Sequence, residues 1–153
     1  MKNAILFFSI ILFLLFIEGC RKYPDDNTLT LWFKVEDKMA ATWDVNYFEV
    51  NGNDSTNYLK SNYNYGYYEL YKNHHQWDSF YYFKNNNNNF MTGRWGASKD
   101  GKTFSIDFDS SFGGVGPYGA KYINWEIRKL TRTQFWIKTT YNNKVYVVHF
   151  GKV

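Results

Sequence analysis

Few residues of this chain have the types and spacing that catalysis or metal binding requires. His74 and His75 are adjacent and Asp78 follows shortly after, so two imidazoles and a carboxylate lie in one short segment. Zinc sites use such ligands, but adjacent residues of an extended chain point in opposite directions, and no cysteine or further histidine lies nearby in the sequence. We interpret the segment as a polar turn, with a metal site as the alternative, and we predict no metal.

The other candidate groups also have simpler structural interpretations. Asp107 and Asp109 share one face of a predicted strand; paired carboxylates serve glycoside hydrolysis, but alternating acids usually mark the solvent side. His149 lies in the last predicted strand and is interpreted as a sheet residue. The glycine-rich residues 113–119 lack the following helix and the Lys-Ser/Thr of a phosphate-binding loop, and no Gly-x-Ser-x-Gly or His-Glu-x-x-His motif is present. The sequence therefore predicts no catalytic residue and no cofactor, and it favours a binding protein over an enzyme.

The first twenty residues predict an export signal and a lipid anchor. Lys2 gives a positive start, and residues 4–17 are apolar except for Ser9. This run is too short for a transmembrane helix, which needs about 20 residues, but it fits a signal-peptide core. Residues 17–20 (Ile-Glu-Gly-Cys) resemble a bacterial lipobox, in which the cysteine is lipidated and becomes the mature N-terminus. We predict a signal peptide over 1–19 and lipidation at Cys20; an uncleaved anchor or ordinary signal cleavage are the alternatives.

This N-terminus has consequences for location and for stability. Cys20 is the only cysteine, so no disulfide remains to stabilise an exported domain. We predict a membrane partner through the lipid anchor, in the cell envelope and at the outer membrane, with a lipidated cysteine and polar tether over 20–28 and one domain over 29–153. The net charge of +4 is small and scattered, which argues against nucleic acid as a partner.

The composition of the mature chain indicates an all-β domain. Aromatic residues make up 22% of the sequence, and they favour strands. Asn-Gly at 51–52, Asp-Gly at 100–101 and Asn-Asn at 142–143 are typical of tight turns. One helical turn is expected over 36–41 with Met39 inward, and loops over 57–64 and 85–89. The predicted strands cover 29–35, 43–47, 65–71, 80–83, 90–97, 104–108, 122–129, 134–140 and 144–150, at the spacing of an all-β barrel or sandwich. A barrel of about eight strands would have an interior that side chains fill or that one small ligand occupies.

Short motifs along the chain resemble one known family. They are Ala-Thr-Trp-Asp-Val at 41–45, Val-Asn-Gly-Asn-Asp-Ser-Thr at 50–56, Gly-Arg-Trp at 93–95 and Trp-Glu-Ile-Arg-Lys-Leu at 125–130, after a Tyr-Pro-Asp at 23–25. Together they resemble the small lipocalin-like lipoproteins common in Bacteroidetes. The resemblance implies an antiparallel up-and-down barrel, and it supplies no catalytic residue.

Two functions remain open. One is a lipocalin-like module that binds a small apolar or amphiphilic ligand; the other is an envelope protein that contacts another protein or a glycan through loops and exposed rings. The first requires an open cavity and the second a filled interior. We expect Trp43, Trp95 and Trp125 to point inward into one cluster. The residues predicted to bind the ligand are Trp43, Trp95, Trp125, Phe104, Tyr65 and Tyr67.

A modification site is also a hypothesis. Asp54-Ser55-Thr56 resembles the short Asp-Ser/Thr sites at which Bacteroidetes O-glycosylate exported proteins, and it follows a predicted turn at 51–52. Turns are exposed, so an enzyme could reach the hydroxyls of Ser55 and Thr56. An unmodified polar turn is the alternative interpretation.

Overall fold

The computed structural model describes residues 22–26, 34–62, 67–72, 79–84, 90–108 and 122–153. Within these ranges the chain forms two short helices and nine strands. The elements are α2 (Val35–Met39), β1 (Thr42–Val50), β2 (Asn53–Asp54), α3 (Thr56–Asn62), β3 (Tyr67–Leu70), β4 (Ser79–Lys84), β5 (Phe90–Ala97), β6 (Thr103–Phe108), β7 (Tyr122–Leu130), β8 (Gln134–Tyr141) and β9 (Lys144–Lys152).

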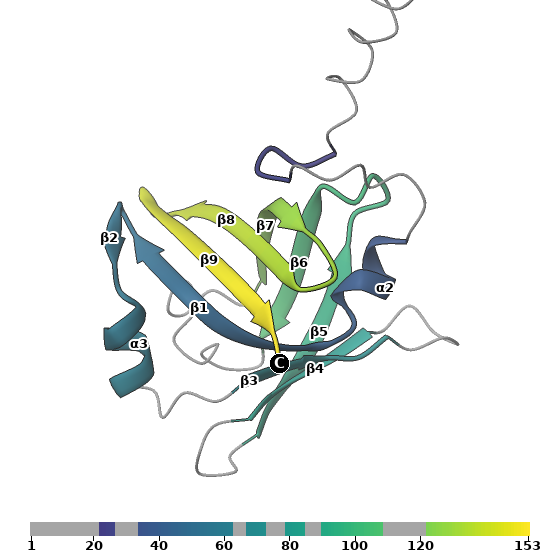
Figure 1. Ribbon diagram of the computed structural model, residues 1–153, viewed down its shortest axis with the longest axis horizontal. Coiled ribbons are helices and arrows are strands. Elements are labelled where there is room, and N and C mark those ends of the chain that lie inside the picture. Colours follow the sequence, from purple (N-terminus) through teal and green to yellow (C-terminus); the bar gives the residue numbers. More distant parts are fainter. Residues whose placement is uncertain (1–21, 27–33, 63–66, 73–78, 85–89, 109–121) are drawn as a thin grey trace, which may run out of the picture.

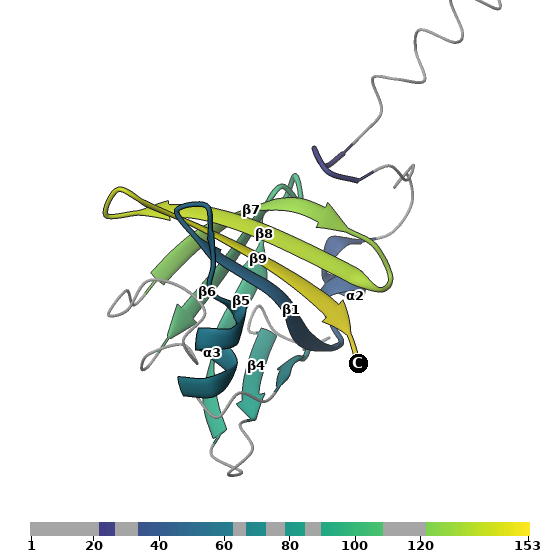
Figure 2. The same ribbon diagram turned by 60° about the vertical axis from the view of Figure 1, so that its left-hand side comes forward.

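The strands form a mostly sequential antiparallel meander. From β3 to β9 each strand pairs with the next, and β1 pairs with β3 on one side and with β9 on the other. The two-residue β2 pairs only with the end of β1. Figures 1 and 2 show the result: β7, β8, β9 and β1 make one broad curved face, and β3 to β6 curve behind it. The eight strands other than β2 therefore form one antiparallel meander, which agrees with the predicted all-β class.

The core is made by alternate residues of these strands. Trp43, Trp95 and Trp125 are 1%, 4% and 0% exposed and belong to one buried cluster, which confirms their predicted inward direction. The helices contribute Met39 of α2 and Leu59 of α3, both fully buried. The predicted helical turn with Met39 inward is therefore confirmed. In β1, β3, β8 and β9 the buried residues turn toward this cluster, because alternation along a strand separates two faces.

A β-bulge changes the faces of β1. The pairing of β1 with β9 shifts between Val45 and Tyr47, so the strand has one extra residue, Asn46. Trp43 and Val45 point inward before the bulge and Phe48 after it. An unbroken strand would place Tyr47 on the same face as Trp43 and Val45; the bulge turns it to the outer face instead.

A second bulge lies in β7. Its pairing with β8 shifts between Ile127 and Lys129, at Arg128. Ile127 and Leu130 are both buried, although an unbroken strand would place them on opposite faces. The bulge thereby turns Lys129 outward and leaves the carbonyl and side chain of Arg128 available for contacts away from β8.

Two other expectations need correction. The predicted strand over 29–35 does not extend to Val35, which begins α2; residues 27–33 lie outside the described residues. The predicted loop over 57–64 is helical as far as Asn62. The Asp54 carboxylate accepts the N–H of Thr56, the first helical residue, at 2.9 Å, and Leu59 anchors the helix in the core.

The predicted turns agree with the structure. Asn51, Asn142 and Asn143 adopt positive φ of 51°, 49° and 59°, and Gly101 has φ of 66°. Asparagine and glycine tolerate this left-handed region, so these hairpins form where the sequence placed them. Several predicted features lie outside the described residues: the signal peptide over 1–19, Cys20, the polar turn at His74, His75 and Asp78, the Asn-rich tip at 85–89, Asp109 and the glycine-rich loop at 113–119.

Candidate functional site

The predicted ligand-binding residues divide into two groups. Trp43, Trp95, Trp125 and Phe104 all lie in the buried cluster. Tyr67 is half-buried on β3, where its neighbour Tyr68 takes the inward position, and Tyr65 lies outside the described residues. The structure thus brings four of the six residues together in the interior and does not add Tyr67 to them.

The interior around these residues is closely packed. Phe104 and Phe135 meet edge-on with ring centroids 5.4 Å apart, and Phe135 stacks on Phe150 at 5.5 Å. The space left among these rings has a volume of about 10 Å³, which is roughly the room for one water molecule. Its lining is Trp43, Tyr68, Leu70, Phe104, Ile106, Phe135 and Phe150. Among the described residues, this space is too small for an organic ligand.

A much larger hollow opens at the surface beside α2. It has a volume of about 310 Å³, which lies at the lower end of the range for small-molecule sites. We call it the α2–β3 groove. It is formed by the end of α2, the start of β1 and the end of β3, and its lining is Asp37, Ala40, Ala41, Thr42, Glu69, Leu70, Tyr71 and Lys72.

The walls of the α2–β3 groove are held by contacts between distant parts of the chain. Leu70 N–H donates to the carbonyl of Ala41 at 2.9 Å and fixes β3 beside the start of β1. The carbonyl of Tyr71 accepts a hydrogen bond from Trp95 Nε1 at 3.0 Å, so the buried indole of Trp95 fixes the backbone at the end of β3. These contacts fix the backbone on one side of the groove.

The polar side chains of the groove are paired around its rim. The ammonium of Lys72 forms an ion pair with Asp37. The hydroxyl of Tyr71 donates to Glu69 Oε2 at 2.6 Å, and Tyr71 is 51% exposed. Ala40, Ala41 and the apolar atoms of the tyrosine supply a non-polar surface between these charges. The groove can therefore accept a molecule that has both an apolar body and a polar or charged group.

Sequence reasoning missed this groove. Its residues come from three segments that are separate in the sequence and meet only because β3 pairs with β1. No motif marks them. The one available signal was the run of tyrosines near residue 67, since a strand cannot bury them all, and Tyr71 is one of those that remain exposed.

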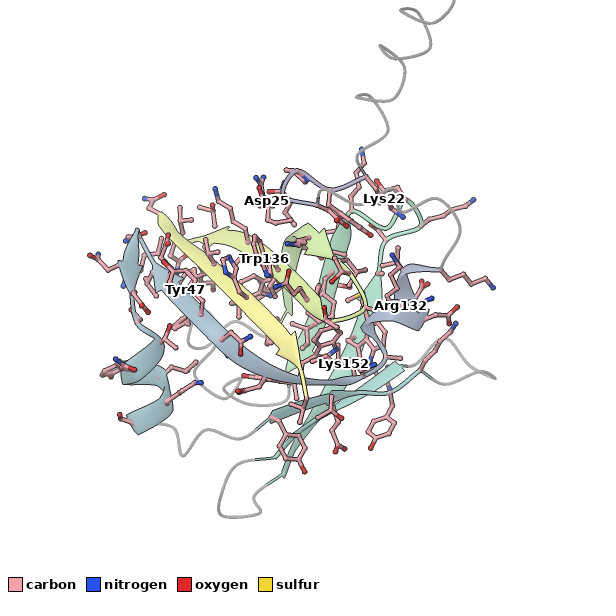
Figure 3. The ribbon with its side chains drawn as sticks, in the orientation of Figure 1. Lys22, Asp25, Tyr47, Arg132, Trp136 and Lys152 are labelled. Carbon is pink, nitrogen blue, oxygen red and sulfur yellow. The ribbon has the colours of Figure 1, made fainter. Side chains whose placement is uncertain are left out.

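A row of stacked side chains crosses the outer face of four strands. Tyr47, His149, Trp136 and Lys129 are successive pairing partners on β1, β9, β8 and β7. The ring centroids of Tyr47 and His149 are 4.9 Å apart, those of His149 and Trp136 are 4.1 Å apart, and Lys129 Nζ lies 4.3 Å from the Trp136 ring. Figure 3 shows Tyr47 and Trp136 on this face. Because β8 lies between β7 and β9, the indole is flanked by a cation on one side and an imidazole on the other.

The segment 22–26 is docked against the domain. Asp25 N–H donates to the Arg128 carbonyl at 2.9 Å, and the Arg128 guanidinium donates to both oxygens of Asp25, at 2.9 and 3.1 Å. Tyr23 is 1% exposed and Asp26 is fully buried. The hydrogen bonds to Arg128 lower the pKa of Asp25 below its usual value. The β7 bulge thus holds part of the predicted polar tether firmly on the domain.

The two hydroxyls of the predicted glycosylation site differ in their contacts. Thr56 Oγ1 donates to Asp54 at 2.6 Å and accepts the Phe48 N–H at 2.9 Å, so it links α3 to β1. Ser55 Oγ makes a longer contact of 3.3 Å with the Asn53 carbonyl. The Ser55 hydroxyl is therefore the easier of the two to modify without loss of a structural bond.

The described residues contain no cluster of three potential metal ligands. Within the same ranges, neither helix has the length and apolar character needed to cross a bilayer.

Comparison with known proteins gives a structural match only. No protein-family profile matches the chain, and no curated protein does either. The chain is similar in structure to a lipocalin-like protein from Bacteroides uniformis ATCC 8492, with a TM-score of 0.46 and 12% sequence identity. The alignment covers 76% of this chain and 99% of that protein.

Proposed function

We propose that this chain is a lipoprotein of the cell envelope, anchored at Cys20, whose lipocalin-like domain binds a small amphiphilic molecule in the α2–β3 groove. The observation that carries the binding proposal is the contrast between two volumes: about 310 Å³ in the groove and about 10 Å³ in the space that the described core rings leave between them. A ligand pocket is typically concave and largely apolar with a few polar groups, and the groove has both kinds of lining.

We propose a closed up-and-down barrel as the scaffold. Seven register pairs between β1 and β9 and two between β1 and β3 support closure. A closed barrel has no free sheet edge, which suits an exported domain without a disulfide. Binding is proposed without catalysis: the groove holds Asp37 and Glu69 already engaged with Lys72 and Tyr71.

Native mass spectrometry of protein purified from membranes tests both halves of the proposal. The expected spectrum shows a diacyl or triacyl mass on the peptide that begins at Cys20 and a small molecule that dissociates from the folded domain. Cys20→Ala should remove the acyl mass and either release the domain or leave an unprocessed precursor. A wild-type mass that retains residues 1–19 without lipid would refute the anchor, and a lipidated protein without any small molecule would count against the ligand.

The second candidate is an envelope interaction protein. The packed space among the core rings and the exposed row Tyr47–His149–Trp136–Lys129 favour it, because aromatic side chains are enriched at protein interfaces. In-cell cross-linking from position 138, beside this row on β8, separates the two candidates. A specific protein partner captured there, with an empty groove, would favour interaction over ligand binding.

A further inference from the structure

The docked segment 22–26 limits where the lipid anchor can lie. Asp25 is held by three hydrogen bonds to Arg128, and Tyr23 is buried, so Lys22 has a defined place on the domain. Cys20 precedes Lys22 by two residues. Two residues of extended chain span about 7 Å at most, so a lipid on Cys20 must enter the bilayer close to Lys22.

The surface next to Lys22 is basic. Its ammonium lies over the β5–β6 turn, because a Cβ added to Gly101 would stand 2.6 Å from Lys22 Nζ. Lys99 and Lys102 flank Gly101 and are exposed. We call Lys22, Lys99 and Lys102 the anchor-side patch. Figure 3 shows Lys22 and Asp25 in the segment 22–26, on the same side of the sheet.

The carboxylates near this patch are already engaged. Asp100 accepts hydrogen bonds from the Ser98 hydroxyl at 2.5 Å and from Lys102 N–H at 3.0 Å. Asp25 is paired with Arg128, and Asp26 is buried. Asp100 itself keeps its negative charge, because both of its hydrogen-bond donors are neutral and they lower its pKa. Three ammonium groups and this one carboxylate leave two net positive charges at this surface.

We propose that the anchor-side patch rests on the phosphate groups of the phospholipids that surround the anchor, and so fixes one orientation of the domain on the membrane. The inference rests on the proposed acylation of Cys20. Basic groups held within a Debye length of an anionic lipid surface are attracted to it, and the docked segment places these lysines within that distance. A domain on a free tether would not present one face in this way.

Lysine reactivity in native membranes tests the proposal. Membranes that contain the full-length lipidated protein are treated with an amine-acetylating reagent before and after detergent solubilisation, and each lysine is quantified by mass spectrometry. The three lysines of the patch should react about fivefold more slowly in the membrane than in detergent. The attraction of each ammonium group to the lipid phosphates is the cause, and a change of about fivefold matches the usual strength of that attraction. Lys144 is the internal control. It is exposed at the start of β9, in the hairpin that joins β8 to β9, and it is not part of the anchor-side patch, so it should react equally in both samples.

A pair of variants separates charge attraction from simple proximity. The double substitution Lys99→Gln and Lys102→Gln should raise the membrane reactivity of Lys22 toward its detergent value. The matched substitutions Lys138→Gln and Lys144→Gln should leave it unchanged. The acyl mass on Cys20 is measured in the same samples, so a missing lipid would refute the anchor and this inference together.

Three results would overturn the inference while the anchor stands. Equal reactivity of the patch lysines in membrane and detergent would show that the patch does not touch lipid. Protection that persists in detergent would assign the surface to a protein or glycan. Protection of Lys129 and Lys138 instead would place the outer face of β7 and β8 on the membrane.

Discussion

The imidazole of His149 stacks on the indole of Trp136, with ring centroids 4.1 Å apart and an angle of 16° between the planes. Tyr47 covers the other side of the imidazole, so His149 is the middle of a row of rings on the outer face. The row depends on the two bulges. Without them Tyr47 and Lys129 would point inward, and His149 would lack its neighbour on β1.

The partly buried position of His149 in this row predicts that the stability of the domain depends on pH. Burial lowers the pKa of His149, although Asp25 and Glu49 act to raise it; Lys129 adds to the lowering. The unfolded chain therefore binds a proton near the ordinary histidine pKa of about 6.5, while the folded chain does so only at lower pH. The contribution of His149 to the free energy of unfolding is therefore fully present above the unfolded pKa of about 6.5. It is lost as the pH falls toward the pKa of the folded state.

In the wild type, we expect the urea concentration at the unfolding midpoint to decrease when the pH is lowered from 7 to 5. The fall should be smaller in His149→Gln, which keeps a planar polar group but cannot titrate. Trp136→Phe retains the histidine and an aromatic neighbour and serves as the control. An identical pH dependence in wild type and His149→Gln would show that this histidine keeps an ordinary pKa.

The Asp25–Arg128 contact predicts how firmly the segment 22–26 is held. The pair is partly exposed, so Asp25→Asn should cost only about 0.5–1 kcal/mol of global stability. Its larger effect should be local, because the Asp25 amide and the buried Tyr23 lose their support. Hydrogen exchange of the amides in 22–26 should become faster.

Glu126→Gln is a matched control for this experiment. Glu126 also accepts from Arg128, at 3.0 Å, but both residues of this pair lie on β7 and neither belongs to the segment 22–26. Its substitution should leave exchange there unchanged. Unaltered exchange in Asp25→Asn would mean that Tyr23 alone anchors the segment.

Two buried tryptophans predict different responses to the same substitution. Trp43 Nε1 donates to the Met39 carbonyl at 2.8 Å, whereas Trp125 Nε1 has no hydrogen-bond acceptor among the described residues. Trp43→Phe leaves a buried carbonyl without its donor, while Trp125→Phe removes a buried N–H that is unsatisfied. Chemical denaturation should show Trp43→Phe to be less stable than Trp125→Phe by about 1–3 kcal/mol.

Complete removal of the Trp43 ring provides a reference for the two Trp→Phe substitutions. Trp43→Ala should cost about 3–5 kcal/mol, as expected for a large buried ring. If Trp43→Phe proves no worse than Trp125→Phe, the bond to Met39 contributes nothing to stability.

The turn before α3 predicts the position of any O-glycan. The Thr56 hydroxyl bonds to Asp54 and Phe48, so a sugar there would break the link between α3 and β1. We expect a glycan on Ser55, and Ser55→Ala should remove it from the native protein's intact mass. Thr56→Ala should instead lower stability. A glycan mapped to Thr56 would contradict this assignment, and an unmodified mass would leave the segment as a polar turn.

Much of the fold could be predicted because it follows from local rules. Aromatic or alternating segments between turn residues identified β4 to β9, and Asn or Gly with positive φ marked the hairpins at 51–52, 100–101 and 142–143. The inward direction of the three tryptophans followed from the same alternation. Strand alternation and turn residues are local signals, because each involves only a few neighbouring residues. They can therefore be recognised in one sequence without knowledge of the fold.

The remaining features depend on contacts between distant residues. The bulge at Asn46 places its amide against Gly151, where a Cβ would lie 2.3 Å from Nδ2, and no local pattern links these two positions. The α2–β3 groove likewise exists only after β1 and β3 pair. The helix α3 was locally encoded, by the Asp54 carboxylate at its start and by Leu59, but its polar composition suggested a loop.

The most direct test of the central claim is amphiphile binding by the folded protein, measured with the fluorescent probe 1-anilinonaphthalene-8-sulfonate. Wild type should bind it saturably. Ala40→Phe should fill the α2–β3 groove and weaken binding by about tenfold, equivalent to about 1.4 kcal/mol. Lys138→Ala, on the far outer face, and Phe104→Leu, in the interior, should bind as wild type does. Binding that survives Ala40→Phe but changes in Phe104→Leu would move the ligand into the core and contradict the account.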